Sequence, residues 1–309
     1  MSLEVSTYLY PSDVWEFIRQ QVEKQKSHHL SSTLIKQLPN ELLTLIFTCV
    51  HPKELAGKLS LVCKKWNIVS SQKYLWDSFD LKKLFPLIKN VIDEKVWKKH
   101  VDVTAFGLIV DDAMPPDSRT DIPELTKLFA SITLEDDESG VTILTMPQRL
   151  TLNKLWKIAE SPLSGNKTGC EYIWDKITEQ FGDLPVTKTC RVVITNSLLK
   201  GSRNLSVTQQ QALVNKMGCE MPGVLPVSTL AILTYISSPE LPPVRLYGDE
   251  PPTYVRCSNK VDKKWNVCAG DFELVGFNVF SYVFDVGDVD VGVAGLKELS
   301  SLPIQRRRF

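Results

Sequence analysis

One segment near the N-terminus is apolar on almost every side. Residues 40–50 read NELLTLIFTCV. An amphipathic surface helix has one apolar stripe that faces the core, and its other face is wet. A helix through this segment has two apolar stripes. It therefore needs two surfaces to bury them, either within its own chain or on a partner. The stripes are made by Leu42, Leu45, Ile46 and Cys49, and by Leu43, Phe47 and Val50.

The first hundred residues predict a compact all-helical unit with short connections. Pro39 and Pro52 each suit the first turn of a helix, where the missing N–H costs nothing. Two further helical stretches follow around residues 74–85 and 91–101, and the second of them carries Trp97. The unit is short for its apolar content, which favours a partner as the cover for the second stripe.

Charge marks the segment that follows. The chain has no formal net charge, so it has no general attraction to nucleic acid or to an anionic membrane. Residues 101–140 nevertheless hold 2 basic against 10 acidic residues, and the stretch 110–124 contains three prolines. This composition predicts an acidic linker that is sensitive to proteases.

Beyond residue 140 the pattern becomes a mixture of strands and helices. VTILTM (141–146) and CRVVIT (190–195) predict strands, because β-branched residues are frequent in both. Apolar spacing predicts helices at 150–161, 170–182 and 206–218, and Gly218 is placed to end the last of these.

The end of the chain predicts an antiparallel sheet. VSTLAILTYI (227–236) is compatible with a buried strand or a buried helix, whereas the sequence from Pro251 alternates as antiparallel strands do. The fold class is therefore α+β: an N-terminal all-helical unit, an acidic proline-containing linker, and a mixed α+β domain that ends in antiparallel strands. The expected parts are an N-terminal helix or extension at 1–32, the helical unit at 33–100, the linker region at 101–140 and the C-terminal domain at 141–309.

Residues 38–76 resemble the F-box family. In that family a Leu-Pro pair opens a helix, and a Val-Cys-Lys-x-Trp helix and a Leu-Trp pair follow. Here the corresponding residues are Leu38-Pro39, Glu41-Leu42-Leu43, Ile46-Phe47, Val62-Cys63-Lys64-Lys65-Trp66 and Leu75-Trp76.

The resemblance implies a partner for the second apolar stripe. F-box helices bind the Skp-type adaptor of cullin–RING ubiquitin ligases, and a large exposed apolar patch usually marks an interface. The positions that the resemblance assigns to this partner are Leu38, Pro39, Leu42, Leu43, Ile46, Phe47, Leu59, Val62 and Cys63.

The whole chain also resembles F-box-bearing proteins of intracellular bacteria, through segments such as CRVVITNSLLKGSRNLSVTQQQALV. This resemblance implies action in the cytoplasm of a eukaryotic host. The cysteines agree with a reducing compartment, since the seven of them are widely spaced and form no CxxC motif. No apolar run reaches the roughly 20 residues of a membrane span, and no secretory signal is visible at the N-terminus.

The inventory of reactive residues argues against an enzyme. All four histidines lie in the first hundred residues, so the C-terminal domain is expected to contain no Cys–His pair. No cysteines or histidines have zinc-ligand spacing. Asp285, Asp288 and Asp290 lack the calcium-loop pattern and suit strand ends and turns. KGSRN (200–204) is a loop rather than a phosphate-binding motif. We expect no cofactor.

The sequence therefore predicts a non-catalytic adaptor with two protein partners, a Skp-type adaptor leading to a cullin and a target of unknown identity. Two alternatives remain: the C-terminal domain is an enzyme tethered to the F-box, or the chain is an F-box scaffold that works without a ligase. Protein interfaces are enriched in aromatic residues, although any single aromatic residue more often lies in the core than at an interface. In the C-terminal domain these residues include Tyr235, Tyr247, Tyr254, Trp265 and Tyr282.

Overall fold

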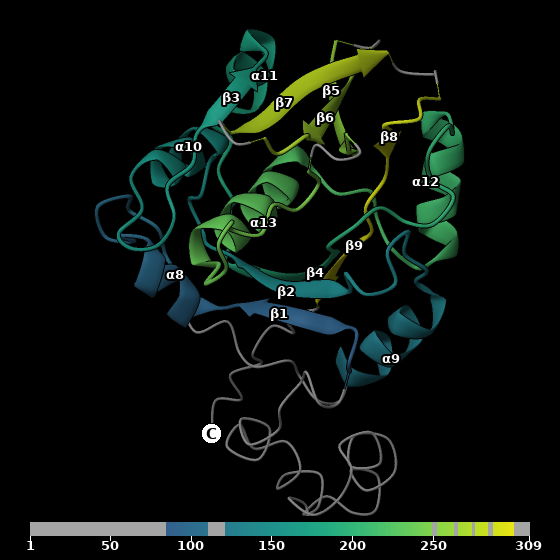
Figure 1. Cartoon of the computed structure of the whole chain (residues 1–309), viewed down its shortest axis with the longest axis horizontal. Helices are drawn as coiled ribbons and strands as arrows, with labels where there is room; N and C mark the ends of the chain where they lie inside the picture. The colour runs from purple at the N-terminus through teal and green to yellow at the C-terminus, as the bar shows by residue number, and fades with distance from the viewer. Residues whose placement is uncertain are drawn as a thin grey trace, which may run out of the picture. The chain divides into compact units, whose positions relative to one another are not determined.

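The chain divides into two compact units. One consists of Met1–Asp80 with Asp117–Pro123, and the other of Leu81–Pro116 with Glu124–Phe309, which we call the C-terminal unit. Nearly all of the described residues belong to the C-terminal unit (Figure 1). The computed structural model describes residues 85–110, 121–248, 252–262, 265–273, 276–283 and 287–299.

The C-terminal unit contains two β-sheets. The first has the strand order β1-β2-β4-β9, in which β1 runs parallel to β2 and the other neighbours are antiparallel. Its strands are β1 (Ile88–Ile92), β2 (Val141–Met146), β4 (Cys190–Thr195) and β9 (Leu296–Leu299).

The second sheet has the strand order β3-β7-β6-β5-β8. Its three central strands are antiparallel, as the alternation in the sequence predicts, whereas β3 and β8 pair in parallel with β7 and β5. Its strands are β3 (Cys170–Ile173), β5 (Tyr254–Val261), β6 (Trp265–Gly270), β7 (Phe277–Val283) and β8 (Val291–Gly292).

Six helices accompany the sheets in the part of the chain that the structure describes. They are α8 (Glu94–His100), α9 (Asp121–Ser131), α10 (Leu152–Glu160), α11 (Asp175–Phe181), α12 (Val207–Lys216) and α13 (Val224–Ser237). Ser206 and Gln209 form a capping box at the start of α12, and Gly218 follows its end with a φ of 70°. None of these helices combines the length and the apolarity that a membrane crossing needs.

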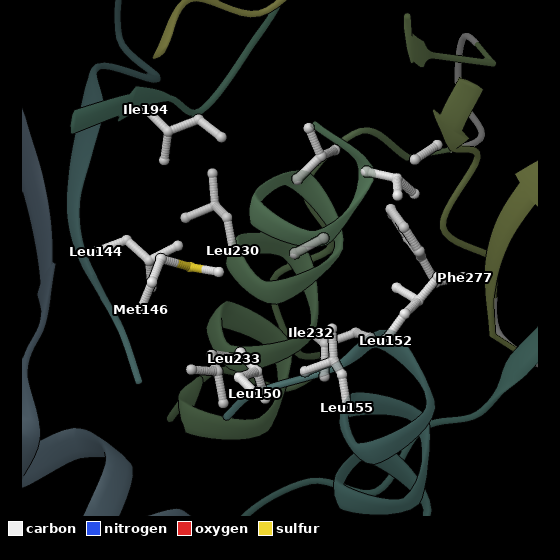
Figure 2. Packing of buried hydrophobic residues seen from close by; sticks show 14 of the residues in the cluster. Leu144, Met146, Leu150, Leu152, Leu155, Ile194, Leu230, Ile232, Leu233 and Phe277 are labelled. Atoms are coloured by element: carbon white, nitrogen blue, oxygen red, sulfur yellow. The ribbon is translucent and has the colours of Figure 1, made fainter. Parts of the chain in front are cut away.

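Residues 227–236, which the sequence left open between a strand and a helix, belong to helix α13. It lies between the two sheets and packs against strands of both (Figure 1). Most of its side chains are buried, as expected for a helix that is apolar all round. Figure 2 shows apolar side chains from both sheets and from α10 around this helix, among them Leu144, Met146, Ile194, Leu152, Leu155 and Phe277.

The local predictions are confirmed for the strands at 141–146 and 190–195 and for the helices at 150–161 and 206–218. The helix expected at 170–182 is wrong in its first part. Its first four residues form β3, which pairs in parallel with β7, and only the remainder forms helix α11. A partner strand more than a hundred residues away therefore overrides the local helical spacing.

The expected boundary at residue 100 also differs from the structure. Strand β1 extends the first sheet, and Trp97 on α8 is fully buried in the core of the C-terminal unit. Its indole Nε1–H donates to the carbonyl oxygen of Thr145 on β2 at 2.8 Å. The region 101–140 is not a free linker throughout either, because it contributes several buried apolar residues: Val101, Leu108, Val110, Leu125, Leu128, Ile132 and Leu134.

The loop at 200–204 precedes α12, as expected, and it also joins distant segments. The Arg203 Nε–H donates to both carboxylate oxygens of Glu135 at 3.0 and 2.9 Å. Its two terminal nitrogens donate to the carbonyl oxygen of Val289 and to the hydroxyl of Thr253. A planar guanidinium suits such a fixed set of acceptors, so Arg203 ties these loops together.

Candidate functional site

The second sheet turns an aromatic face away from the core. Along β7, Phe277 and Val279 are fully buried in the core cluster. The alternate residues Asn278, Phe280 and Tyr282 are only half-buried. Since successive side chains of a strand point to opposite faces, these three residues lie on the outer face of the sheet.

A hollow lies on this face of the sheet. Tyr172 pairs with Asn278, Asn278 with Gly270, and Gly270 with Tyr254, so the four residues form one row across the strands. Gly270 has a φ of 156°, and a Cβ there would lie 2.1 Å from the carbonyl oxygen of Thr253. Close approach of the Thr253 backbone therefore requires glycine at this position. Beside the row lies a hollow of about 390 Å³, the aromatic groove, which is lined by Tyr172, Trp174, Tyr254, Asn278, Phe280 and Ser281.

The rings of the groove are held in different ways. Tyr254 and Phe280 pack edge to face, with ring centroids 4.7 Å apart. Tyr172 stands on the edge strand β3 and is 53% exposed. Trp174 follows β3, and the Lys176 ammonium lies 5.4 Å from the centroid of its ring. Exposed aromatic surface of this kind is typical of recognition sites.

Two carboxylates adjoin the groove. The Asn278 side-chain amide lies within hydrogen-bonding distance of a Glu171 carboxylate oxygen at 3.4 Å and of the Asp271 carbonyl oxygen at 3.2 Å. The Tyr254 hydroxyl donates to the Asp271 carboxylate. Within the described ranges, neither Glu171 nor Asp271 forms an ion pair. The groove therefore combines aromatic faces with uncompensated negative charge.

Burial and nearby negative charge both act on the phenol of Tyr254. Burial is the largest cause that raises the pKa of its phenol above the ordinary value. The hydrogen bond to Asp271 raises it further, and so do the negative charges of Asp271, Asp290 and Glu273. Each of these charges disfavours the phenolate, so Tyr254 stays neutral and serves as a donor and as an aromatic surface.

A buried polar group supports the same sheet beside the groove. Arg256 on β5 is fully buried, and its guanidinium carbon lies 5.8 Å from the centroid of the Tyr282 ring. The Tyr282 hydroxyl donates to the Asp288 carboxylate. This hydrogen bond is the largest cause that lowers the pKa of Asp288, and the backbone N–H of Asp290 adds to it. Asp288 therefore organises a turn, whereas Asp285 lies outside the described residues.

The histidine inventory needs a correction, because His100 belongs to the C-terminal unit. Residues 141–309 contain no histidine, but α8 packs into the core of the same unit and brings His100 with it. His100 is buried, and its Nδ1 lies 2.9 Å from the carbonyl oxygen of Ser164, which requires the proton on that nitrogen. The Ser164 hydroxyl donates to the carbonyl oxygen of Lys99. Both groups thus hold backbone carbonyls in place.

The thiols of the described cysteines are shielded from solvent, wholly or in part, rather than activated. Burial is the main cause that raises the pKa of Cys170 and Cys268 to about 12 and that of Cys219 to about 11. Burial also raises the pKa of Cys190 and Cys257. Thiols with such values stay protonated at neutral pH and are poor nucleophiles. Among the described residues, no three His, Cys, Asp or Glu side chains gather as metal ligands do.

The aromatic residues that the sequence offered for an interface have different roles. The Tyr247 hydroxyl donates to the Thr195 carbonyl oxygen at 2.5 Å from a buried position, and Tyr235 packs on the Phe272 ring. Tyr282 lies on the outer face and Trp265 is 37% exposed, but Tyr254 alone of the five lines the groove.

Tyr172 and Trp174 were missed because a helix was expected through them. The alternation of Asn278, Phe280 and Tyr282 along β7 was the signal that could have identified this face. The positions assigned to the Skp-type adaptor lie outside the described residues: Leu38, Pro39, Leu42, Leu43, Ile46, Phe47, Leu59, Val62 and Cys63.

Comparison with known proteins identifies the N-terminal part of the chain. Residues 35–82 match the family model described as F-box-like. No curated protein and no solved structure matches the chain. F-box domains are typically non-catalytic adaptors that bind Skp-type proteins, which indicates a general role in ubiquitin ligation. The chain therefore carries an F-box-like domain, followed in sequence by a larger α+β unit.

Proposed function

We propose that this protein is a substrate-recruiting adaptor of a cullin–RING ubiquitin ligase. In this proposal the F-box-like domain docks onto a Skp-type adaptor and through it onto a cullin, and the C-terminal unit holds a protein target. The observation that carries the proposal is the F-box-like match at residues 35–82, joined to a compact unit with an exposed aromatic groove.

The mechanism is proximity rather than bond chemistry. A target held on the C-terminal unit stays close to a charged ubiquitin-conjugating enzyme, which raises the effective concentration of its lysines. The adaptor needs no nucleophile for this purpose. The protonated thiols and the engaged His100 side chain of the C-terminal unit are compatible with that role. We further propose that such an adaptor acts in eukaryotic cytoplasm and that this cytoplasm belongs to a host cell, in line with the resemblance of the sequence to F-box-bearing proteins of intracellular bacteria.

The two apolar stripes of residues 40–50 support the docking step. In this proposal one stripe packs inside the helical unit and the Skp-type adaptor covers the other. Leu38 and Pro39 open the motif, so we place them at the edge of the unit where a partner reaches them. Burial of a leucine side chain contributes about 1.5–3 kcal/mol, so a few such residues suffice for a stable contact.

We expect the double substitution Leu38→Ala with Pro39→Ala to weaken binding to a Skp-type adaptor by about tenfold or more, because it removes apolar contact area at the interface. The measurement is titration of the purified full-length protein with the adaptor by isothermal calorimetry. Circular dichroism should show unchanged helical content.

The matched control is Tyr172→Ala, which removes an exposed apolar side chain from the C-terminal unit and should leave adaptor affinity unchanged. Equal affinity of the double variant and the unmodified protein would refute the docking assignment. A loss of helical content would place both residues in the core of the helical unit instead.

A further inference from the structure

The aromatic groove joins two properties that together define a ligand class. Its lining includes the aromatic side chains of Tyr172, Tyr254 and Phe280. Glu171 and Asp271 lie beside these rings and have no ion-pair partner among the described residues. A neutral ligand would use the rings but would leave both carboxylates uncompensated. A cation uses both features at once.

We propose that the aromatic groove binds the cationic side chain of a lysine or arginine in a target polypeptide. This inference rests on the proposed function only for the identity of the polypeptide as the recruited target. An ammonium or guanidinium over an aromatic ring is attracted by the negative face of the ring, and nearby carboxylates strengthen the attraction.

The same part of the molecule already holds cations on aromatic rings. Lys176 lies 5.4 Å from the ring centroid of Trp174, and Arg256 lies 5.8 Å from that of Tyr282. Lys176 is also paired with Asp262 at 3.1 Å, so an aromatic ring and a carboxylate share one ammonium there. Tyr172 with Glu171 offers the same combination to a ligand from outside the chain.

The position of the groove favours a polypeptide over a small cation. Tyr172 and Glu171 stand on β3, the edge strand in the order β3-β7-β6-β5-β8. An edge strand can accept an extended peptide by main-chain hydrogen bonds, while side-chain pockets supply the specificity. A peptide alongside β3 passes the mouth of the groove, where its basic side chain meets the rings.

The test uses the full-length protein and three acetylated, amidated heptapeptides. The first is Ser-Gly-Thr-Lys-Thr-Gly-Ser, and the other two replace its lysine by arginine or by norleucine. Binding is followed by NMR through the indole N–H of Trp174 in protein labelled with ¹⁵N-tryptophan. We expect the lysine and arginine peptides to bind at least about fivefold more tightly than the norleucine peptide. Added salt should weaken the binding of the two basic peptides.

Groove variants locate the site. We expect each of three substitutions to weaken the binding of the lysine peptide by about threefold or more: Tyr172→Ala, Glu171→Gln and Asp271→Asn. Asparagine suits position 271, whose φ is 51°. Two matched controls should bind the peptide normally: Trp265→Ala removes an exposed aromatic residue outside the groove, and Glu179→Gln removes an exposed charge on α11.

Three results would overturn the proposal: equal affinity for the lysine and norleucine peptides, no binding of either basic peptide, or normal binding by all three groove variants. Failure here is separable from failure of the proposed function. Tyr172→Ala should keep its adaptor affinity, and the Leu38→Ala, Pro39→Ala protein should still bind the lysine peptide. A groove that ignores cations on a protein that binds the adaptor refutes this inference alone.

Discussion

A fragment that begins at residue 101 should fail to fold, whereas a fragment that begins at residue 81 should unfold cooperatively. The shorter fragment lacks β1 and α8. Without β1, the apolar strand β2 becomes an uncovered edge of the first sheet, and all six of its residues are buried in the intact unit. Without α8, the core loses Trp97 and the donor to the Thr145 carbonyl oxygen. Both losses expose apolar surface that is buried in the intact unit.

Thermal unfolding followed by circular dichroism distinguishes the fragments 81–309 and 101–309. Protease cleavage within 111–120 offers a control in the full-length chain, because β1 and α8 should then stay attached through their packing and separate only in denaturant. A cooperative transition in the 101–309 fragment would show that β1 and α8 are dispensable. The domain boundary that the sequence predicts at residue 100 would then be correct.

The sequence revealed the elements whose signals are local. Strands β2 and β4 are short β-branched runs, and α12 has a capping box at one end and Gly218 at the other. Each of these signals lies within the element itself. The F-box-like motif was accessible for the same reason, since its residue types and spacings fall within one short segment.

Strands that form only because they pair with a distant strand could not be predicted from local signals. Strand β1 is short and carries Lys89 and Asn90 among its five residues, and its identity depends on pairing with β2 about 50 residues later. Strand β3 has a helix-compatible spacing, and its strand conformation depends on β7. In both cases the pairing between strands decides the outcome, and propensity within a single segment does not report it.

The aromatic groove required the register of four strands. Tyr172, Asn278, Gly270 and Tyr254 are dispersed over more than a hundred residues, and only the pairing places them in one row. Tyr254 could be named as a candidate because tyrosine is frequent at interfaces. The presence of Tyr172 and Phe280 beside it could not be anticipated, because their positions depend on which strands pair.

The substitution Trp97→Ala should destabilise the C-terminal unit by about 3–5 kcal/mol, since it removes the largest of the fully buried side chains and leaves a cavity. It also leaves the Thr145 carbonyl oxygen without its indole donor. Trp97→Phe keeps an aromatic ring but loses this hydrogen bond, so its cost should be smaller, about 1–2 kcal/mol. The measurement is urea unfolding of the 81–309 fragment.

The matched control is Trp265→Ala, the same chemical change at a side chain that is 37% exposed. It should change the free energy of unfolding by about 0.5 kcal/mol, since solvent already reaches this indole. The ratio between the losses in free energy of unfolding of the two alanine variants tests whether α8 packs into the core more directly than either loss alone. Similar costs for Trp97→Ala and Trp265→Ala would mean that α8 lies on the surface of the C-terminal unit rather than in its core.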